Sequence, residues 1–217
     1  MTALIPTEAT LPGRDQPLPL IDGHHVHGRH FMPPFADGLA QAIVGMGCFW
    51  GAERRFWQMA GVSNTQVGYM GGSTSNPSYK EVCTGATGHA EVVKVEFNPS
   101  IITYPELLIA FWQMHDPTTL NRQGNDIGTQ YRSGIFYTST EQKIIAMKSK
   151  EIYQHELDRL GFDLITTEIL PAPDFWEAEE YHQRYLEKNP NGYDCHATTG
   201  VPFPIGLLSQ EQSGSNV

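Results

Sequence analysis

The stretch from Ala40 to Ala60 limits the possible folds most strongly, because a buried-strand pattern leads directly into a helical one. Ala40–Met46 is short, apolar and followed by glycine, which favours a buried strand, although periodicity alone also allows a helical segment. Trp50–Ala60 has apolar residues at helical spacing, and Gly61 is a typical helix stop. We therefore expect a strand, a turn and a helix here.

Cys48 lies in the turn of this unit, within Gly47-Cys48-Phe49-Trp50-Gly51. Unpaired N–H groups and the helix dipole favour a thiolate near a helix N-terminus, so the position suits a nucleophile. It suits a packed cysteine beside two aromatic rings equally well, since unpaired cysteine is among the most buried residues. Position alone leaves both interpretations open.

Composition narrows the class of protein. The chain has 217 residues and 40% hydrophobic content, enough for one domain with appended arms. A net charge of −10 argues against a nucleic-acid partner and against attraction to anionic membranes. No apolar run reaches the length of a membrane span, and Met1–Leu20 lacks the basic and apolar regions of a signal peptide. We expect a soluble, cytoplasmic protein.

Cysteine and histidine usage bears on redox and metal chemistry. Cys48, Cys83 and Cys195 are too few for a disulfide scaffold and show no CxxC spacing for zinc. A reducing compartment would keep them as thiols unless chemistry joins two of them. Four histidines cluster in a proline-rich stretch, where no regular element would fix a metal ion. They are His24, His25, His27 and His30. We expect no metal and no cofactor, and an irregular N-terminal arm over residues 1–38.

Strand and helix patterns follow one another through the rest of the chain. Thr103 and Glu106 have the spacing of a capping box, with Pro105 in the first turn, so a helix should start here. Further helices are predicted from the cap Thr140 to Leu160 and over Phe175–Lys188. Strands are predicted over Val62–Tyr69, Ala90–Phe97, Gly134–Tyr137 and Leu164–Leu170.

This order of elements favours one fold class without excluding another. The sequence of elements is βαβ, βαβ, then α, β and α, and its short connections favour an α+β two-layer sandwich with helices covering a mixed sheet. A doubly wound sheet stays open at this point. We assign residues 39–190 to the catalytic domain and residues 191–217 to a flexible C-terminal tail.

Three separate segments mix polar and aromatic side chains beyond what a simple core requires. They are residues 76–83, residues 88–91 and residues 124–132. Each has a plain structural interpretation: Tyr79 and Tyr131 as rim aromatics, Glu91 as an edge-strand charge, and Asp126 as an Asx-turn residue. When each residue is judged singly, its structural interpretation is favoured over a catalytic role.

Taken together, residues 42–193 closely resemble the A-type peptide methionine sulfoxide reductases, which act on the S epimer of methionine sulfoxide. The resemblance rests on many short blocks in the same order. These blocks are Gly47-Cys48-Phe49-Trp50-Gly51, Gly68-Tyr69, Gly71-Gly72, Asn76-Pro77-Ser78-Tyr79, Gly88-His89-Ala90-Glu91, His115-Asp116-Pro117, residues 123–126 and 128–132, Tyr181-His182-Gln183, Tyr185-Leu186 and Asn189-Pro190. The resemblance implies a ferredoxin-like βαββαβ core.

The resemblance also implies a role for each site residue. Cys48 would be the nucleophile, Glu91 the acid/base, Tyr79 and Tyr131 hydrogen-bond donors to the sulfoxide oxygen, and Asp126 a support for this polar cluster. Phe49 and Trp50 would form the apolar wall that receives the substrate methyl group. Physically, the departing oxygen needs a proton, so Glu91 must be neutral, and enclosure by aromatic groups raises a carboxyl pKa in that direction.

Turnover requires a second cysteine, because attack leaves a sulfenic acid on Cys48. Cys195 lies in a glycine-rich tail and is the better candidate, whereas we interpret Cys83 as an inert packed thiol. The family points to thioredoxin as the reductant. This chain departs from the family pattern, since Asp194 stands between Gly192-Tyr193 and Cys195, and residues 200–204 carry no further recycling cysteine. A two-cysteine relay is expected.

Two rival interpretations remain at this stage. Cys48 paired with His89 or His182 would suit thiol acyl transfer or proteolysis, which forms a thioester and oxidises no thiol. Alternatively, the N-terminal histidines would form a metal-binding or partner-binding module. The reductase is favoured over both.

Overall fold

The computed structural model describes residues 6–16, 25–26, 29–30, 38–194, 197–204 and 206–209 of the chain. Its helices are η1 (Thr7–Ala9), α1 (Phe49–Trp57), α2 (Tyr79–Cys83), α3 (Tyr104–Gln113), η2 (Thr129–Tyr131), α4 (Thr140–Arg159), η3 (Glu180–His182), α5 (Tyr185–Lys188) and α6 (Gly206–Ser209). Its strands are β1 (His25–Val26), β2 (Arg29–His30), β3 (Ala40–Met46), β4 (Val62–Met70), β5 (Ala90–Phe97), β6 (Arg122–Gln123), β7 (Asp126–Ile127), β8 (Ser133–Tyr137), β9 (Glu168–Pro171) and β10 (Trp176–Glu177).

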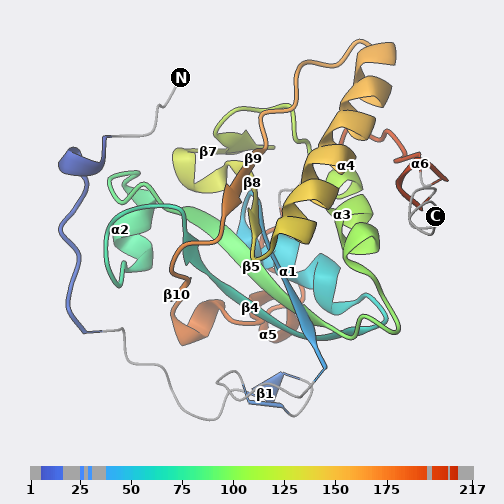
Figure 1. Cartoon of the computed structure of the whole chain (residues 1–217). Coiled ribbons are helices and arrows are strands. Elements are labelled where there is room, and N and C mark those ends of the chain that lie inside the picture. Colours follow the sequence, from blue (N-terminus) through green and yellow to red (C-terminus); the bar gives the residue numbers. More distant parts are fainter. Residues whose placement is uncertain are drawn as a thin grey trace.

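A six-stranded sheet with the order β10-β4-β5-β3-β8-β9 forms the centre of the molecule (Figure 1). Its four middle strands pair antiparallel. Apart from the short elements α2, β6, β7 and η2 inserted in the connections, the chain order is β3, α1, β4, β5, α3 and β8, which is βαββαβ. This is the predicted ferredoxin-like core. At one edge β9 pairs parallel with β8, so the sheet is mixed. The predicted α+β class is confirmed, and the doubly wound alternative is wrong because that fold needs a mainly parallel sheet.

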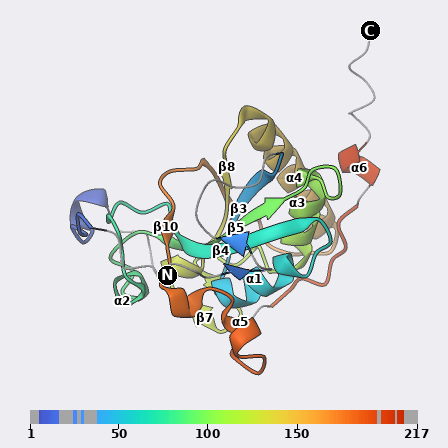
Figure 2. The ribbon, with the colours of Figure 1, turned by 90° about the horizontal axis from the view of Figure 1, so that it is seen from below.

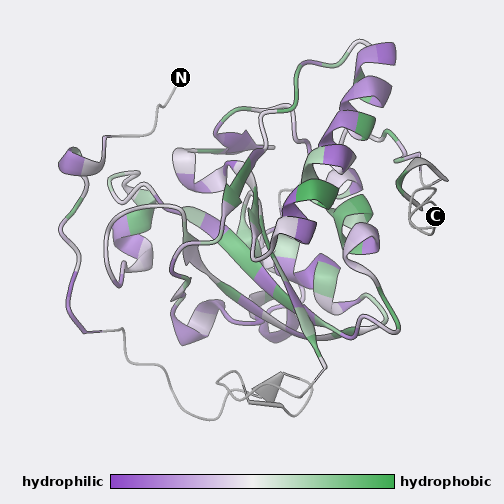
Figure 3. Ribbon diagram, in the orientation of Figure 1, coloured by the Kyte–Doolittle hydropathy of each residue, from purple (hydrophilic) through white to green (hydrophobic). Residues whose placement is uncertain are grey.

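The two faces of the sheet are covered differently. Helices α1, α3 and α4 cover one face, where Val44, Val93 and Phe111 belong to the main buried cluster. Alternate residues such as Val92 point to the other face and form a smaller cluster with Phe175 packed against it. In Figure 3, hydrophobic strands lie at the centre and the largely hydrophilic α4 lies outside. Figures 1 and 2 place α2 and residues 6–16 on one side of the sheet, and α6 on the other.

Helix starts follow local capping signals. Thr103 and Glu106 form the predicted capping box of α3. The predicted cap of α4 is wrong by one residue: Ser139 is the N-cap, because its hydroxyl accepts from the Gln142 amide at 3.1 Å. At its other end, Gly161 has φ +78°, a conformation that favours glycine.

The predicted helix over Phe175–Lys188 is wrong. This segment forms β10, η3 and the four-residue α5 instead. The side chain of Gln183 explains the difference, since it accepts from the amide of Val67 and donates to its carbonyl, both at 2.9 Å. Gln183 thereby takes the place of a strand partner for β4. Such long-range bonds override the local helical pattern.

The strand predicted over Leu164–Leu170 is shorter than expected. Only Glu168–Pro171 pairs with β8, and Leu164 is exposed. The amide of Thr166 donates instead to the Pro117 carbonyl at 2.8 Å, and the amide of Ile165 to the Gln154 side chain at 2.7 Å. These bonds leave residues 164–167 outside the sheet.

The described part of the predicted tail is packed against the domain. Val201 and Phe203 are buried, and the Phe203 ring stacks on Tyr153 of α4. The Tyr153 hydroxyl donates to the Val201 carbonyl at 2.9 Å and lies 2.8 Å from the Thr199 hydroxyl. The division into arm, catalytic domain and tail stays a prediction, but residues 197–204 have fixed contacts.

Candidate active site

Cys48 is the N-cap residue of α1, directly after β3. Gly47 before it has φ +90°, and a Cβ at this glycine would lie 2.5 Å from the Gln123 side chain. Glycine therefore allows the sharp turn that leaves Cys48 at the first turn of the helix. The residue is only 6% exposed. The structure thus gives the thiol both properties that the sequence left as alternatives: burial, and a place at a helix N-terminus.

Glu91 reaches the same helix end from β5. Its carboxylate oxygen Oε2 accepts from the Phe49 amide at 2.9 Å, so it lies beside the residue that follows Cys48. The side chain is 1% exposed. Burial raises its pKa from 4.5 to about 8, the Phe49 hydrogen bond opposes this shift, and the nearby charge of Asp126 adds to it. Glu91 is therefore mostly protonated at neutral pH, with an oxygen available to donate.

Tyr79 and Tyr131 share the environment of Glu91 while coming from different elements. Tyr79 opens α2, where its amide donates to Glu179 Oε1 at 2.9 Å. Tyr131 closes η2. Burial raises the pKa of both phenols, and in both the charge of Glu91 is the next cause. Both hydroxyls therefore stay protonated and can act as hydrogen-bond donors.

Arg132 holds the Tyr131 segment against the strand that carries Glu91. Its guanidinium donates to the Gly88 carbonyl at 3.0 Å and to the Thr129 carbonyl at 2.9 Å, and it pairs with Glu168 at 3.0 Å. Gly88 lies just before β5 and Thr129 begins η2. One buried side chain therefore fixes the two segments relative to each other.

Phe49 and Trp50 form an aromatic wall with residues from the C-terminal region. The Phe49 ring lies 5.0 Å from the His182 ring and 5.8 Å from the Tyr69 ring, measured between centroids. Trp50 stacks on Tyr185 at 3.9 Å, and its Nε1 donates to His182 Nδ1 at 2.9 Å. The wall is therefore held in one orientation from both sides.

The sequence suggested His182 only as the base of the rival acyl-transfer interpretation and gave it no part in the reductase site, although its block was among those quoted for the resemblance. The side chain is buried, and its ring also lies 4.4 Å from that of Tyr79. Burial lowers its pKa to about 4, so the ring is neutral and Nδ1 can accept from Trp50. His182 thus joins the aromatic wall to the phenol of Tyr79.

Asp126 lies on β7 and contacts the start of the tail. Its Oδ1 accepts from the Tyr193 hydroxyl at 2.9 Å. The charge of Asp126 also contributes to the raised pKa values of Glu91 and Tyr131. Tyr193 is therefore a second residue to which the sequence gave no part in the reductase site, and it brings the tail to the candidate site.

The interpretation of Cys83 as a packed thiol is wrong, because the residue is exposed at the end of α2. Its side chain lies within hydrogen-bonding reach of the Tyr79 hydroxyl, and partial desolvation raises its pKa. A surface thiol with a raised pKa is less nucleophilic at neutral pH.

Cys195 lies outside the described residues, but its neighbours are placed. Asp194 forms ion pairs with Arg54 and with Arg55, the latter at 3.2 Å, and both arginines lie in the last turn of α1. Thr199 is held by Tyr153 on the other side. The residue that interrupts the family pattern therefore anchors the segment just before Cys195.

The acyl-transfer alternative receives no support from the histidines. His89 Nδ1 accepts from the Gly72 amide at 3.0 Å, and Nε2 lies 2.8 Å from the Thr74 carbonyl, so both ring nitrogens hold a loop. His182 Nδ1 is occupied by the Trp50 indole.

The N-terminal histidines fall mostly beyond what the structure describes. His24 and His27 lie outside the described residues, and of His25 and His30 only the backbone is placed, as paired residues of β1 and β2. Over the described ranges, no group of three or more His, Cys, Asp or Glu side chains is arranged to hold a metal ion. Within the same ranges, no helix is both long and apolar enough to cross a membrane.

Comparison with known proteins identifies the family. The family model for peptide methionine sulfoxide reductase matches residues 40–202. The peptide methionine sulfoxide reductase MsrA of Rippkaea orientalis is 57% identical over 204 residues, covering 94% of each chain. The solved structure of methionine sulfoxide reductase A of Corynebacterium diphtheriae has a TM-score of 0.82 and 41% identity, covering 92% of this chain and 99% of the other.

A third comparison concerns a complex. The crystal structure of Mxr1 from Saccharomyces cerevisiae in complex with Trx2 matches with a TM-score of 0.51 and 25% identity, covering 77% of this chain and 95% of that chain. The sequence matches extend over the core, the residues around Cys48 and the start of the tail. The chain therefore belongs to the peptide methionine sulfoxide reductase family and is an oxidoreductase that reduces methionine sulfoxide.

Proposed function

We propose that this protein reduces the S epimer of methionine sulfoxide by attack of Cys48 on the sulfoxide sulfur, with Glu91 as the proton donor. The observation that carries this proposal is the buried carboxyl of Glu91, bonded to the Phe49 amide beside Cys48 and held at a pKa of about 8. A protonated acid at neutral pH is what a departing oxide oxygen needs.

The first step transfers the sulfoxide oxygen from the substrate sulfur to Cys48. The thiolate of Cys48 supplies an electron pair to the sulfoxide sulfur, while Glu91 protonates the sulfoxide oxygen. This attack forms an S–S bond between Cys48 and the substrate sulfur. The protonated oxygen then leaves the substrate sulfur and attacks the sulfur of Cys48, so the S–O bond and the new S–S bond both break, methionine leaves, and Cys48 carries a sulfenic acid. The substrate sulfur is reduced by two electrons and the cysteine sulfur is oxidised by two.

Tyr79 and Tyr131 would hold the sulfoxide oxygen before proton transfer. Their raised pKa values keep both phenols protonated, and both respond to the charge of Glu91, which supports a common target for the three groups. Phe49 and Trp50 would receive the methyl group, because an apolar wall accepts a methyl and disfavours a charged or hydrated substituent. This division of contacts accounts for a preference for one epimer.

Cys195 completes the cycle in this proposal. Its thiol attacks the sulfenic acid on Cys48, a disulfide forms and water leaves. The ion pairs of Asp194 and the Tyr193–Asp126 hydrogen bond support this role, since they bring the residues before Cys195 onto α1 and the candidate site. A dithiol reductant then reopens the disulfide. The complex of Mxr1 with Trx2 supports a protein reductant, and the family resemblance points to thioredoxin.

The substrates in this proposal are methionine sulfoxide in oxidised proteins and the free amino acid, and the role is repair after oxidative stress in the cytoplasm. In a protein substrate, the methionine sulfoxide side chain would have to lie at a chain end or in a mobile loop to reach Cys48 at the start of α1. The cytoplasmic location stays a prediction.

Thiol counting tests the proposal. Fully reduced protein is mixed with each resolved epimer of methionine sulfoxide, without external reductant, and methionine and thiols are measured. With the S epimer we expect methionine to form and two thiols to disappear. Cys195→Ser should leave a sulfenic acid that dimedone traps on Cys48, whereas Cys83→Ser should still lose two thiols. If wild-type protein keeps all its thiols and forms no methionine, the proposed function is overturned.

A further inference from the structure

The N-terminal segment, residues 6–16, contacts the loops before and after α2. In this segment, the Leu11 amide donates to the Ala86 carbonyl at 2.9 Å and the Leu11 carbonyl accepts from the Thr74 hydroxyl at 2.7 Å. Thr10 and Ser73 bring their hydroxyls to 2.7 Å of each other. The contacts join residues more than sixty positions apart in the sequence, so they are tertiary and not local.

The closest approach occurs at Gly13, which pairs with Ser75 in a parallel bridge. Gly13 has φ +76°, and a Cβ there would lie 2.3 Å from the Ser75 carbonyl oxygen. No side chain fits in that space, so the two backbones can meet only because this residue is glycine. The loop is thus held by direct backbone contact.

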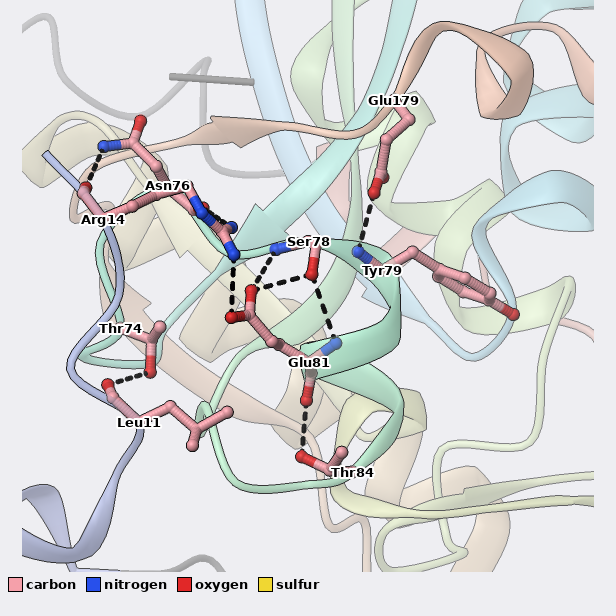
Figure 4. A network of polar contacts seen from close by, with 9 residues as sticks. All are labelled: Leu11, Arg14, Thr74, Asn76, Ser78, Tyr79, Glu81, Thr84 and Glu179. Atoms are coloured by element: carbon pink, nitrogen blue, oxygen red, sulfur yellow. Dashed lines mark hydrogen bonds and ion pairs between the residues drawn. The ribbon is translucent and has the colours of Figure 1, made fainter. Parts of the chain in front are cut away.

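Arg14 contacts both this loop and α2 (Figure 4). Its Nη1 donates to the Asn76 carbonyl at 2.7 Å and its Nη2 to Glu81 Oε1 at 2.8 Å. In return, the Asn76 side chain donates to the Arg14 carbonyl at 2.7 Å. Asn76 has φ +47°, a left-handed conformation that asparagine adopts more readily than most residues other than glycine. The planar guanidinium holds the turn and the first helical turn after it at once.

Glu81 passes this restraint to Tyr79. Its other oxygen, Oε2, accepts from the Ser78 amide at 2.8 Å and from the Ser78 hydroxyl at 2.7 Å, closing the capping box of α2. Tyr79 is the first residue of this helix, which has only five residues. Helices this short are not stable alone, so the position of α2 depends on its cap and its tertiary contacts.

We propose that Arg14 is a positioning residue of the active site: through Asn76 and the Glu81–Ser78 capping box it fixes α2 so that the Tyr79 hydroxyl meets the sulfoxide oxygen. This inference rests on the proposed function, in which Tyr79 binds that oxygen. It extends the working site to the N-terminal segment, which the family model, matching residues 40–202, does not include. Glu179 holds the Tyr79 amide at 2.9 Å, and Arg14 adds a second restraint on α2 through Glu81.

A double-mutant cycle tests this role. The single-turnover rate of methionine formation is measured at saturating substrate for wild type, Arg14→Ala, Tyr79→Phe and the double variant. Small displacements of a catalytic group cost orders of magnitude, so we expect Arg14→Ala to lower the rate about tenfold. Once Tyr79 has lost its hydroxyl, the same substitution should lower the rate less than about twofold, because nothing remains to position.

Two further variants make the result specific. Arg14→Lys keeps the charge but not the two-pronged geometry, and should recover only part of the rate. Arg159→Ala is the matched control, since Arg159 makes a similar 2.8 Å pair with Glu156 on the surface of α4 and should leave the rate unchanged. Equal losses in both Tyr79 backgrounds, or no loss with Arg14→Ala in the wild-type background, would overturn the role of Arg14. Absence of methionine formation by wild-type protein would instead overturn the proposed function.

Discussion

The pKa of Glu91 allows a quantitative prediction about the first catalytic step. Burial moves this pKa from 4.5 to about 8. At pH 7 about nine tenths of the carboxyl is then protonated, against about 0.3% for a carboxyl with the ordinary value. The fold therefore raises the protonated fraction of the Glu91 carboxyl about 300-fold at pH 7.

The substitution that tests this is Glu91→Gln. The amide keeps the size of the side chain and can accept the Phe49 hydrogen bond, but it cannot transfer a proton. A positioned general acid contributes about 10²–10⁴-fold, so the rate of methionine formation should fall by at least about 100-fold at pH 7. In wild type the rate should stay level up to about pH 8 and fall about tenfold per pH unit above it. The variant should lack this decline, so the ratio of the two rates shrinks at high pH.

The assay is rapid-quench measurement of methionine in a single turnover between pH 6 and pH 10. Glu53→Gln is the matched control, because Glu53 is equally buried and its pKa is also raised by burial to about 8. Glu53 bonds to the Thr65 hydroxyl and the Arg184 amide, and not to the amide beside Cys48. The rate of methionine formation by Glu53→Gln should still fall above pH 8, as it does in wild type. If Glu91→Gln keeps the same decline, or loses no rate at pH 7, Glu91 is not the proton donor.

Two other predictions concern stability and the tail. Glu53 binds its proton more tightly in the folded protein than in the unfolded one, so its stabilising effect is complete below pH 4.5 and lost as pH rises to about 8, at a cost of up to about 5 kcal/mol. In urea unfolding, Glu53→Gln should therefore match wild type at pH 5 and exceed it at pH 9; an identical pH dependence of both proteins would contradict this. Asp194→Asn should leave the rate of methionine formation in the first turnover unchanged. It should slow formation of the Cys48–Cys195 disulfide severalfold, because it weakens the ion pairs with Arg54 and Arg55. Dimedone trapping should then increase, and an unchanged disulfide rate would argue against the anchor.

Sequence signals located most elements whose causes are local. The capping box of Thr103 and Glu106 acts within a few residues, so it appears in the structure as expected. The segment 175–188 could not be predicted in this way. Its conformation depends on the bonds of Gln183 to Val67, which lies more than one hundred positions earlier, and periodicity carries no information about such partners.

The residues of the candidate site show the same division. Cys48, Glu91, Tyr79 and Tyr131 were predicted as site residues from the resemblance, and a neutral Glu91 was expected on chemical grounds. Only the structure shows that full burial raises the pKa of Glu91 and that its carboxyl bonds to the amide next to Cys48. Tyr193 was missed and His182 was considered only as a rival base, since their contacts appear only when the C-terminal region is placed on α1 and β7. Cys83 was misjudged because burial depends on which face of α2 meets the core.

The sequence by itself determined the strand-turn-helix unit around Cys48, the family, and the set of chemical groups available for sulfoxide reduction. Only the tertiary structure decided how these groups are arranged. Burial of Glu91 beside the Phe49 amide keeps its carboxyl protonated at neutral pH. Contacts with distant segments hold α2, through Arg14 and Gly13, and the start of the tail, through Asp194. The physical reason is that capping and periodicity operate within a few residues, whereas desolvation and hydrogen bonding depend on which distant residues the fold brings together.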